Sequence, residues 1–417
     1  MRVLLFEDER TTRLYPLTVG RPAMTIACGG YRLIDLIERL GVVRAAVRQY
    51  LRPVLSADWP DLVAPWPKKG GQPLLLVNAR LVPGVGMIER LRTWAAAGRP
   101  GIVYRDNAVV AALFPPGTAP PDALSSTAVA EWLAAVDIPE AAELDPPLLD
   151  WPLLDWPHDV VRYHLDVISE NLADRLERGA YREVADGVFA AEGVKLGQYC
   201  VSEADDGPIL LDHDVRVGPF CYLSGPAYLG PRSRVLEHAA IKDGVCLGHT
   251  TKVGGEVEAS VIEPLSNKQH HGFLGHSYLG SWVNLGAGTC NSDLKNTYGT
   301  VAMEYEGHKV GTGMQFIGCI IGDYAKTAIN TSIFTGKTIG ACSMVYGYVT
   351  TNVPSFVNYA RQFGQVTEAP VEVMIATQSR MFRRRGVEQR PCDVELLQTM
   401  HDLTRHERQL ANQPLAL

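Results

Sequence analysis

A six-residue spacing of aliphatic side chains dominates the third quarter of the sequence. It occupies eight successive positions: Leu211, Val217, Leu223, Leu229, Val235, Ile241, Leu247 and Val253. An α-helix gives a period near 3.6 and a half-buried strand a period of 2, so neither produces this pattern. A parallel β-helix of triangular coils does, because each face of a coil contributes one inward-facing side chain. The spacing therefore predicts a left-handed parallel β-helix of the hexapeptide-repeat type.

The register lapses at about 254–272 and at 291–315, and it resumes after each stretch. We expect loops or irregular coils there, and a loop that leaves a rigid solenoid is a common place for function. Glycine follows the aliphatic residue at Gly218, Gly230 and Gly248, where a tight corner leaves little room for a side chain. Beyond Pro354 the repeat ends, and a helical pattern predicts an extension that caps the open end of the solenoid.

The first 180 residues have the pattern of an α/β domain. Val3–Phe6 and Leu74–Val77 are short apolar runs typical of parallel strands buried on both faces. Arg32–Leu40 and Ile88–Ala97 carry apolar residues at helical spacing. The Pro-rich stretch 115–157 is expected to be irregular, and a helix at 164–176 is expected to close this half.

Three parts follow from these patterns: an α/β domain at 1–180, a β-helix at 181–356 and a helical extension at 357–417. The length of 417 residues agrees with two or three units. The net charge of −7 argues against a general nucleic-acid binder. The one basic cluster, Arg380 with Arg383–Arg385, is interpreted as a solvated helix end or a subunit contact.

The eight cysteines include no CxxC pair, which favours a reducing compartment over disulfides or a metal site. The sequence begins with a short apolar run followed at once by charges, and no apolar run of about 18 residues is found. We therefore expect a cytoplasmic protein that neither binds nor crosses a membrane.

Two adjacent histidines, His270 and His271, fall in the first lapse, with the glycine turn Gly286–Gly288 one coil away. Acyl transfer to an amine or a hydroxyl needs a base with a pKa near neutrality, for which histidine is suited. Backbone N–H groups of a glycine turn can stabilise the oxyanion. An isolated histidine pair is usually a solvated one, but this setting favours catalysis. His276 is a third candidate base.

The stretch SNKQHHGFLGHSYLGSWVNLGAGTCNSDLKN, residues 266–296, resembles the acetyltransferase half of the bifunctional N-acetylglucosamine-1-phosphate uridylyltransferase/glucosamine-1-phosphate acetyltransferases. Aligned without a gap, the family's catalytic histidine falls on His270 and its sugar-contacting asparagine on Asn284. Its substrate-binding tyrosine falls on Phe273. The resemblance thus implies substrate binding by Phe273 and Asn284, to which we add Lys268 from the same stretch.

The stretch TRLYPLTVGRPAMTIACGGYRLIDL, residues 12–36, resembles the opening of sugar-1-phosphate nucleotidyltransferases, which implies a Rossmann-like nucleotidyltransferase fold. Arg13 matches the family's phosphate-neutralising arginine, and Arg21 is a second nucleotide-binding candidate. The family's glycine-rich loop is replaced around Asp8, and Arg80 stands where a metal-holding aspartate is expected. We therefore expect a degenerate nucleotidyltransferase domain, with no metal site unless that domain is active, in which case it would use Mg²⁺.

The resemblance implies an acyltransferase that uses acetyl-CoA or another acyl-CoA on a sugar phosphate or nucleotide sugar. It also implies a homotrimer with its active site between neighbouring solenoids, and a CoA groove near residues 328–340. One alternative is a sugar-1-phosphate nucleotidyltransferase with an altered phosphate loop. Another is a non-catalytic trimeric scaffold that binds a nucleotide sugar.

Overall fold

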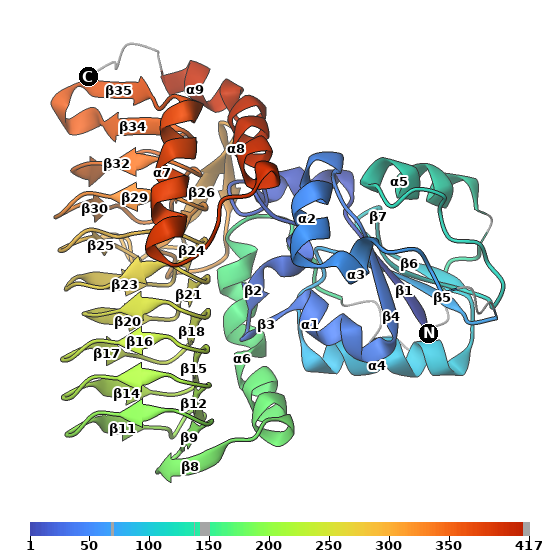
Figure 1. Ribbon diagram of the computed structural model, residues 1–417, viewed down its shortest axis with the longest axis horizontal. Helices are drawn as coiled ribbons and strands as arrows, with labels where there is room; N and C mark the ends of the chain where they lie inside the picture. The colour runs from blue at the N-terminus through green and yellow to red at the C-terminus, as the bar shows by residue number, and fades with distance from the viewer. Residues whose placement is uncertain (68–70, 137, 142–150, 412–417) are drawn as a thin grey trace. The chain divides into compact units, whose positions relative to one another are not determined.

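The computed structural model describes residues 1–67, 71–136, 138–141 and 151–411 (Figure 1). The chain divides into two compact units. The first unit comprises residues 1–14, 20–26 and 31–156, and the second comprises 15–19, 27–30 and 157–417. The helix expected at 164–176 is α6, Asp159–Arg178, and its contacts place it in the second unit.

The first unit is built on one mixed five-stranded sheet in the order β4-β1-β5-β7-β6. β1 (Arg2–Phe6) lies between β4 (Val42–Ala46) and β5 (Leu74–Asn78), and both pairings are parallel. β7 (Ala108–Phe114) and β6 (Gly101–Arg105) complete the sheet in antiparallel fashion. The two apolar runs predicted to be buried strands of a parallel sheet are confirmed; the structure adds that they pair with each other, and β5 is fully buried.

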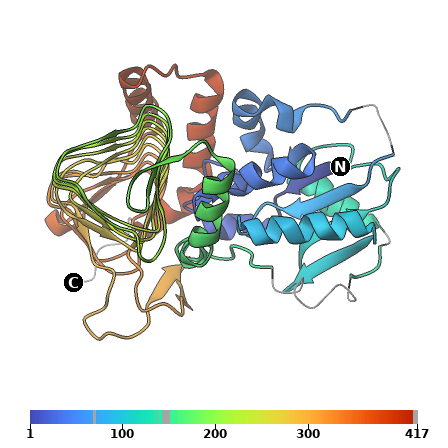
Figure 2. The same ribbon diagram turned by 90° about the horizontal axis from the view of Figure 1, so that it is seen from below.

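Helices α4 (Val85–Ala97) and α5 (Ser126–Ala135) lie on opposite sides of this sheet (Figures 1 and 2). α5 falls in the stretch expected to be irregular, so that expectation is wrong there. Ser125 caps its start by accepting a hydrogen bond from the Ala128 N–H at 3.2 Å. Trp132 of α5 then packs on Phe114 with ring centroids 4.8 Å apart. The rest of that expectation falls partly on residues 137 and 142–150, which lie outside the described residues.

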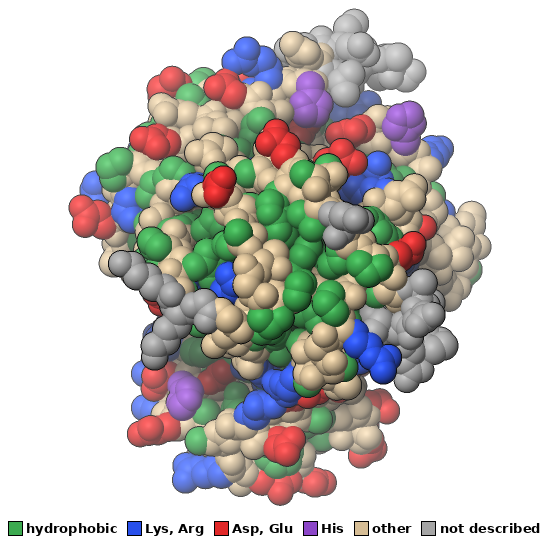
Figure 3. Space-filling view, turned by 90° about the vertical axis from the view of Figure 1, so that its right-hand side faces the viewer, with side chains coloured by type: hydrophobic (Ala, Val, Ile, Leu, Met, Phe, Trp, Pro, Cys, Tyr) green, Lys and Arg blue, Asp and Glu red, His purple; other side chains and the backbone are tan. Residues whose placement is uncertain are grey.

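Short elements complete the N-terminal region: η1 (Glu9–Leu14), η2 (Ala23–Thr25), β2 (Ala27–Cys28), β3 (Tyr31–Arg32), α1 (Leu33–Ile37), η3 (Glu38–Leu40), η4 (Gln49–Leu51), α2 (Arg52–Asp58) and α3 (Pro60–Val63). Apolar side chains of α5 and the loops pack partly buried against the core of the sheet. The face drawn in Figure 3 shows apolar side chains gathered at its centre, with charged side chains around them.

The second unit is dominated by a left-handed parallel β-helix, as the six-residue spacing predicted. All eight positions of the predicted register point inward, and none is more than 4% exposed. The first face carries β10 (Lys195–Leu196), β13 (Arg216–Val217), β16 (Arg234–Val235), β19 (Lys252–Val253) and β22 (Asn267–Lys268). The second carries β11 (Val201–Glu203), β14 (Tyr222–Ser224), β17 (Ala240–Ile241), β20 (Glu256–Glu258) and β23 (Phe273–Gly275).

The third face is a nine-stranded sheet: β8 (Arg182–Ala185), β9 (Val188–Ala190), β12 (Ile209–Leu211), β15 (Ala227–Leu229), β18 (Val245–Leu247), β21 (Val261–Ile262), β24 (Tyr278–Leu279), β28 (Cys319–Ile321) and β31 (Lys337–Ile339). The later coils add β25 (Cys290–Asn291), β30 (Ser332–Ile333) and β33 (Tyr348–Val349) as one sheet. They add β29 (Lys326–Thr327), β32 (Met344–Val345), β34 (Val357–Ala360) and β35 (Gln365–Glu368) as another.

The corner glycines are required by the approach of the next coil. A Cβ added at Gly218 or Gly230 would lie 2.5 Å from a backbone atom of the following coil. The left-handed backbone conformation of the corner comes two residues later, at Phe220 (φ 58°) and Arg232 (φ 59°). Glycine at these corners therefore serves packing between coils, and the strained φ angle is carried by larger residues.

The first lapse in the register is a shortened coil, so of the two expected alternatives, a loop or an irregular coil, the structure shows the irregular coil. Fifteen positions separate Lys252 from its partner Asn267, against eighteen between Arg234 and Lys252. Lys268 takes the inward position next to Val253, so a polar residue breaks the aliphatic pattern. The second lapse is a true insertion, which contains the hairpin β26 (Ala302–Tyr305) and β27 (His308–Gly311).

The predicted helical extension is α7 (Val371–Arg384), α8 (Pro391–Leu403) and α9 (Arg405–Ala411). The antiparallel pair β34–β35 and α9 lie at one end of the solenoid, whereas α7 runs along its side as far as the coils of Trp282 and Asn267 (Figure 1). Along the side of the coils, α6 packs Ile168 and Leu172 against Leu210 and Cys246. In the part of the chain that the structure describes, no helix has the length and apolar character of a membrane span.

Candidate functional site

The turn that carries the paired histidines is fixed from inside the solenoid. Lys268 is 2% exposed, and its Nζ donates hydrogen bonds to the carbonyls of Gly254 (2.7 Å), His270 (2.9 Å) and Gly272 (2.7 Å). Burial lowers the pKa of Lys268 to about 8. All three ammonium protons have backbone partners, so Lys268 holds the turn 269–272 in place and does not present its amine to a ligand.

His270 and His271 are both exposed on this turn. The backbone N–H of Gly288 donates to the carbonyl of His271 at 3.0 Å. The His271 ring lies so close that a Cβ on Gly288 would be 3.4 Å from its Nε2. The structure thus brings His271 to the glycine turn of NLGAGT, as the one-coil spacing predicted. Among the described residues, neither imidazole has a side-chain hydrogen bond.

The two aligned substrate-binding candidates lie on the faces that meet at this turn. Phe273 begins β23 on the second face, and its backbone N–H donates to the Cys290 Sγ at 3.3 Å. Asn284 is exposed on the first face and accepts a hydrogen bond from the Asn267 amide at 3.3 Å. These candidates therefore flank the histidine turn on either side, without forming one hydrogen-bonded group with it.

His276 is the histidine of this stretch that has a carboxylate partner. Its Nδ1 lies 2.9 Å from the Oδ2 of Asp293, and both side chains are 15% exposed. The ring also stacks on Phe316 with centroids 5.2 Å apart. With an N–H at Nδ1 pointing to the carboxylate, the Nε2 lone pair is left to accept a proton, as in catalytic His–Asp pairs.

Asp293 was not singled out from the sequence, although a signal for it exists. It follows His276 by 17 positions, which is one coil in this part of the solenoid, where Asn267 pairs with Asn284. Residues one coil apart on the same face are neighbours in space. A histidine and an aspartate at coil spacing therefore predict a contact, once the local coil length is known.

In the first unit, the position expected to hold a metal is filled by an internal ion pair. Arg80 is fully buried, and its Nε and Nη2 contact both carboxylate oxygens of Asp8 at 2.8 and 2.6 Å. Its Nη1 donates to Asp155 at 2.7 Å and to the Leu154 carbonyl at 2.9 Å. Burial alone would raise the pKa of Asp8, but the hydrogen bonds and charge of Arg80, with help from Asn78, bring that pKa below its usual value.

A second acidic residue of the altered loop, Glu7, is neutralised in the same way. The Glu7 side chain is buried and accepts hydrogen bonds from Arg48 Nε and Nη2, both at 3.0 Å. Arg13 is exposed and lies over the Trp156 ring at 5.8 Å. Arg21 accepts a hydrogen bond from Arg48 through its carbonyl. Glu7 and Asp8 are therefore compensated internally, and Arg13 is an exposed cation of the same region.

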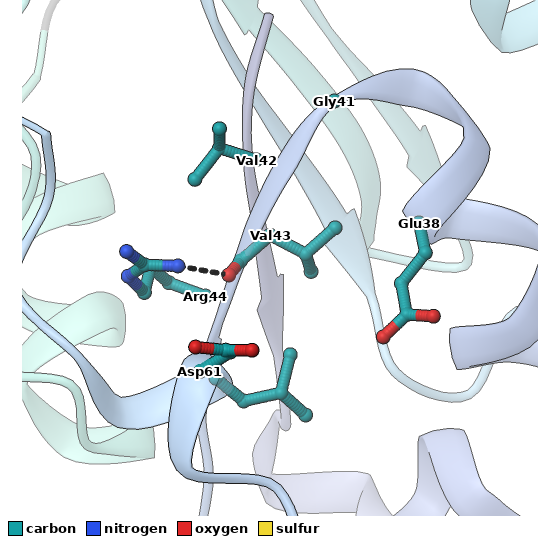
Figure 4. A pocket seen from close by; sticks show the side chains of 7 residues that line it. Glu38, Gly41, Val42, Val43, Arg44 and Asp61 are labelled. Carbon is teal, nitrogen blue, oxygen red and sulfur yellow. Dashed lines mark hydrogen bonds between the residues drawn. The ribbon is translucent and has the colours of Figure 1, made fainter.

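A hollow of about 320 Å³ lies beside the edge strand β4 (Figure 4). It is lined by Glu38, Gly41, Val42, Val43, Arg44, Asp61 and Leu62. The Arg44 guanidinium donates to the Val43 carbonyl at 2.7 Å. None of the residues singled out from the sequence lines this hollow. Within the described ranges, no group of three or more His, Cys, Asp or Glu side chains forms a metal-binding cluster.

Comparison with known proteins finds similarity over parts of the chain. Residues 3–178 match the family model described as sugar nucleotidyl transferase. A bifunctional sugar-1-phosphate nucleotidylyltransferase/acetyltransferase of Sulfurisphaera tokodaii is 29% identical over 142 residues, which is 34% of this chain and 35% of the relative. The bifunctional protein GlmU of Azoarcus is 29% identical over 233 residues, 52% of this chain and 49% of the relative. That of Cupriavidus pinatubonensis is 32% identical over 118 residues, 27% and 25% of the two chains.

Among solved structures, the UDP-N-acetylglucosamine acyltransferase of Francisella novicida is similar over 56% of this chain and 79% of its own, with a TM-score of 0.34 and 14% identity. A Bacillus cereus N-acyltransferase, AntD, has a TM-score of 0.17 and 13% identity over 51% and 96% of the two chains. These values are too low to bear on function. The matches to the curated relatives named above span between a quarter and half of those proteins' lengths.

The chain thus combines a region that matches the sugar nucleotidyl transferase family model with a β-solenoid, and it is similar over part of its length to several bifunctional GlmU proteins, from which it is divergent.

Proposed function

We propose that the solenoid transfers an acyl group from an acyl-CoA to an amine or hydroxyl of a sugar phosphate or nucleotide sugar. The observation that carries this proposal is the His276–Asp293 hydrogen bond, because it leaves an oriented imidazole nitrogen at the corner that follows β23, one corner beyond the histidine turn. His270 and His271 remain proposed alternatives for the base. The experiments below compare the three histidines directly.

A bound acyl-CoA would supply a thioester whose carbonyl carbon is open to attack. The imidazole base accepts the proton from the attacking amine or hydroxyl as the new C–N or C–O bond forms. For a base at His270 or His271, the backbone N–H of Ala287 is the proposed oxyanion donor, because the N–H groups of Gly286 and Gly288 donate to Thr327 and His271. As the C–S bond breaks, the imidazolium returns its proton to the leaving thiolate, so the free thiol and the acylated sugar account for all atoms.

We further propose a homotrimer that places this site between neighbouring solenoids. Support comes from large apolar side chains that are exposed on the coils next to the site: Ile329 is 69% exposed, Phe334 50% and Tyr348 53%. Phe334 and Ile329 lie in the segment 328–340 proposed for the CoA groove. Light scattering of the full chain tests this point: a Phe334→Glu/Tyr348→Glu variant should dissociate, and a monomeric wild type would contradict the trimer.

The test of the activity is thiol release from acetyl-CoA in the presence of amino-sugar phosphates and amino-sugar nucleotides, with mass spectrometry of the acceptor. We expect release that depends on the acceptor, and a product heavier by one acyl group. Release without any acylated acceptor would be hydrolysis and would contradict the proposal. A stable protein that is silent with every donor and acceptor would favour the binding scaffold.

Nucleotidyl transfer by the first unit is a second candidate, favoured by the family match over residues 3–178. The Arg80–Asp8 pair opposes the usual mechanism, because the cation and the carboxylate satisfy one another. Mg²⁺-dependent release of pyrophosphate from a nucleoside triphosphate and a sugar phosphate is the measurement that would establish it.

A further inference from the structure

One face of the solenoid stacks basic side chains on successive coils. Arg216 pairs with Arg234, Arg234 with Lys252, and Lys252 with Asn267, all in parallel register. The residue after each of these points into the solenoid, so the basic side chains point outward. Neighbouring strands are about 4.8 Å apart. Three cations therefore rise in one column, and like charges directly opposite each other on strands are unfavourable.

A second element brings two more cations to the same column. Helix α7 ends at Arg384, and Arg385 Nη2 donates a hydrogen bond to the Asn267 Oδ1 at 2.8 Å. Phe382 fixes this helix end by packing on the Trp282 ring with centroids 4.6 Å apart. The basic cluster near the C-terminus, which the sequence left as a helix end or a subunit contact, thus meets the basic strands of the solenoid.

We call Arg216, Arg234, Lys252, Arg384 and Arg385 the cationic face. Within the described ranges, none of these side chains forms an ion pair with a carboxylate. Burial lowers the pKa of Lys252, and the charges of Arg385, Arg234 and Arg384 lower it further. The pKa of Arg385 is lowered by burial and then by Arg384 and Arg234.

The neighbouring face offers a contrast, a basic side chain that has carboxylate partners. Lys242 lies 2.6 Å from Glu256 and 3.3 Å from Glu258 on the next coil. The carboxyl end of a helix attracts cations, which accounts for Arg384 at the end of α7. It does not account for Arg234 and Lys252 on the strands that face this helix end. Mutual repulsion without a counter-charge costs stability unless an anion is bound.

We propose that the cationic face is a binding site for the phosphate or pyrophosphate group of a small-molecule ligand. Guanidinium groups bind phosphate oxygens in a bidentate manner, and the lysine adds a point charge. The face begins directly before the histidine turn, since Asn267 precedes Lys268 and the turn 269–272. A nucleotide sugar and CoA both carry such groups, so the chemistry of the site is common to the two.

The test is calorimetric titration of the full chain with inorganic pyrophosphate at low salt. The variant Arg234→Gln/Lys252→Gln removes two cations of the face. The matched control, Arg182→Gln/Lys309→Gln, removes two exposed cations elsewhere on the same unit. We expect wild type and control to bind alike and the first variant to bind at least about tenfold more weakly. Equal binding by all three proteins, or no binding by the wild type, would overturn the proposal.

Thermal unfolding without ligand separates binding from packing. Because the cations repel one another, the variant of the face should melt at the wild-type temperature or above it. A lower melting temperature together with unchanged pyrophosphate affinity would mean that the face serves packing, against the proposal. Displacement of bound pyrophosphate by CoA or by UDP supports the site and shows whether the phosphate group that it binds belongs to CoA or to a nucleotide sugar. None of these readouts depends on acyl transfer, so failure of the proposed activity leaves them interpretable.

Discussion

The buried ion pair between Arg80 and Asp8 gives the sharpest prediction for the free energy of unfolding. Replacing Arg80 by methionine removes the four hydrogen bonds that its guanidinium donates to Asp8, Asp155 and the Leu154 carbonyl. The Asp8 side chain is 16% exposed, so solvent screens its charge little. Breaking a buried pair by removing one partner costs about 3–5 kcal/mol. We expect a loss of this size at pH 7 in urea unfolding.

Two companion variants show whether the unpaired charge is the cause. Arg80→Met/Asp8→Asn removes the stranded carboxylate and should recover about half of the loss. Arg92→Met breaks an exposed pair with Glu89, in which Arg92 is 44% exposed, and should cost about 0–1 kcal/mol. A loss below about 1 kcal/mol for Arg80→Met, or no recovery in the double variant, would refute the reasoning.

The Arg80–Asp8 pair also predicts how the free energy of unfolding depends on pH. In the wild type the folded-state pKa of Asp8 is lowered, so its stabilisation is present above the unfolded value of about 3.9 and is lost as pH falls through the folded pKa. In Arg80→Met, burial without the arginine raises that pKa, so Asp8 costs stability at neutral pH. The difference between the two proteins should therefore shrink as the pH is lowered towards 4. If the difference in stability between wild type and Arg80→Met stayed constant with pH, it could not be assigned to the charge of Asp8.

Two further predictions concern the solenoid. The folded-state pKa of Lys268 is about 8 against an ordinary 10.5, so wild type should gain roughly 3 kcal/mol relative to Lys268→Met as pH rises between these values. If the difference in free energy of unfolding between wild type and Lys268→Met, measured in urea, did not change with pH, this would contradict the buried ammonium. Gly230→Ala places a Cβ 2.5 Å from the Leu247 carbonyl oxygen and should cost about 1–3 kcal/mol. A Cβ at Gly311 would meet no atom within 4 Å, so Gly311→Ala should leave the stability nearly unchanged. Equal losses of stability in the two variants would refute the close approach of the next coil to Gly230.

The solenoid could be predicted from the sequence because every coil repeats the same inward position. From Leu211 to Val253 the spacing never changes, and each of these side chains is buried. The prediction stopped where the coil shortened, because the inward residues Val257 and Ile262 follow at four and five positions instead of six. The next inward residue, Lys268, occupies a position that sequence reasoning reserves for aliphatic residues. A buried lysine is understood only when the three carbonyls around it are known.

The site was predicted less completely for the same reason. The gapless alignment selects His270, but it does not show that His276 has an oriented carboxylate, since Asp293 is brought beside it only by the local coil length. The sequence showed that Arg80 stands where the family has a metal-holding aspartate. Its pairing with Asp8 joins residues 72 positions apart and depends on how the sheet folds. Helix α5 was missed because its surroundings are rich in proline.

The central claim is that a histidine of the coil between Asn267 and Asn284, which follows the shortened coil, is the base for acyl transfer. The most direct test measures kcat for acceptor-dependent thiol release in His270→Asn, His271→Asn and His276→Asn, with Asp293→Asn as the probe of orientation. We predict that His276→Asn lowers kcat by about 10²–10⁴-fold and that Asp293→Asn shifts the pH–rate profile. Full activity in His276→Asn would move the role to His270 or His271. Wild-type kcat in all three histidine variants would contradict the claim that one of these histidines is the base.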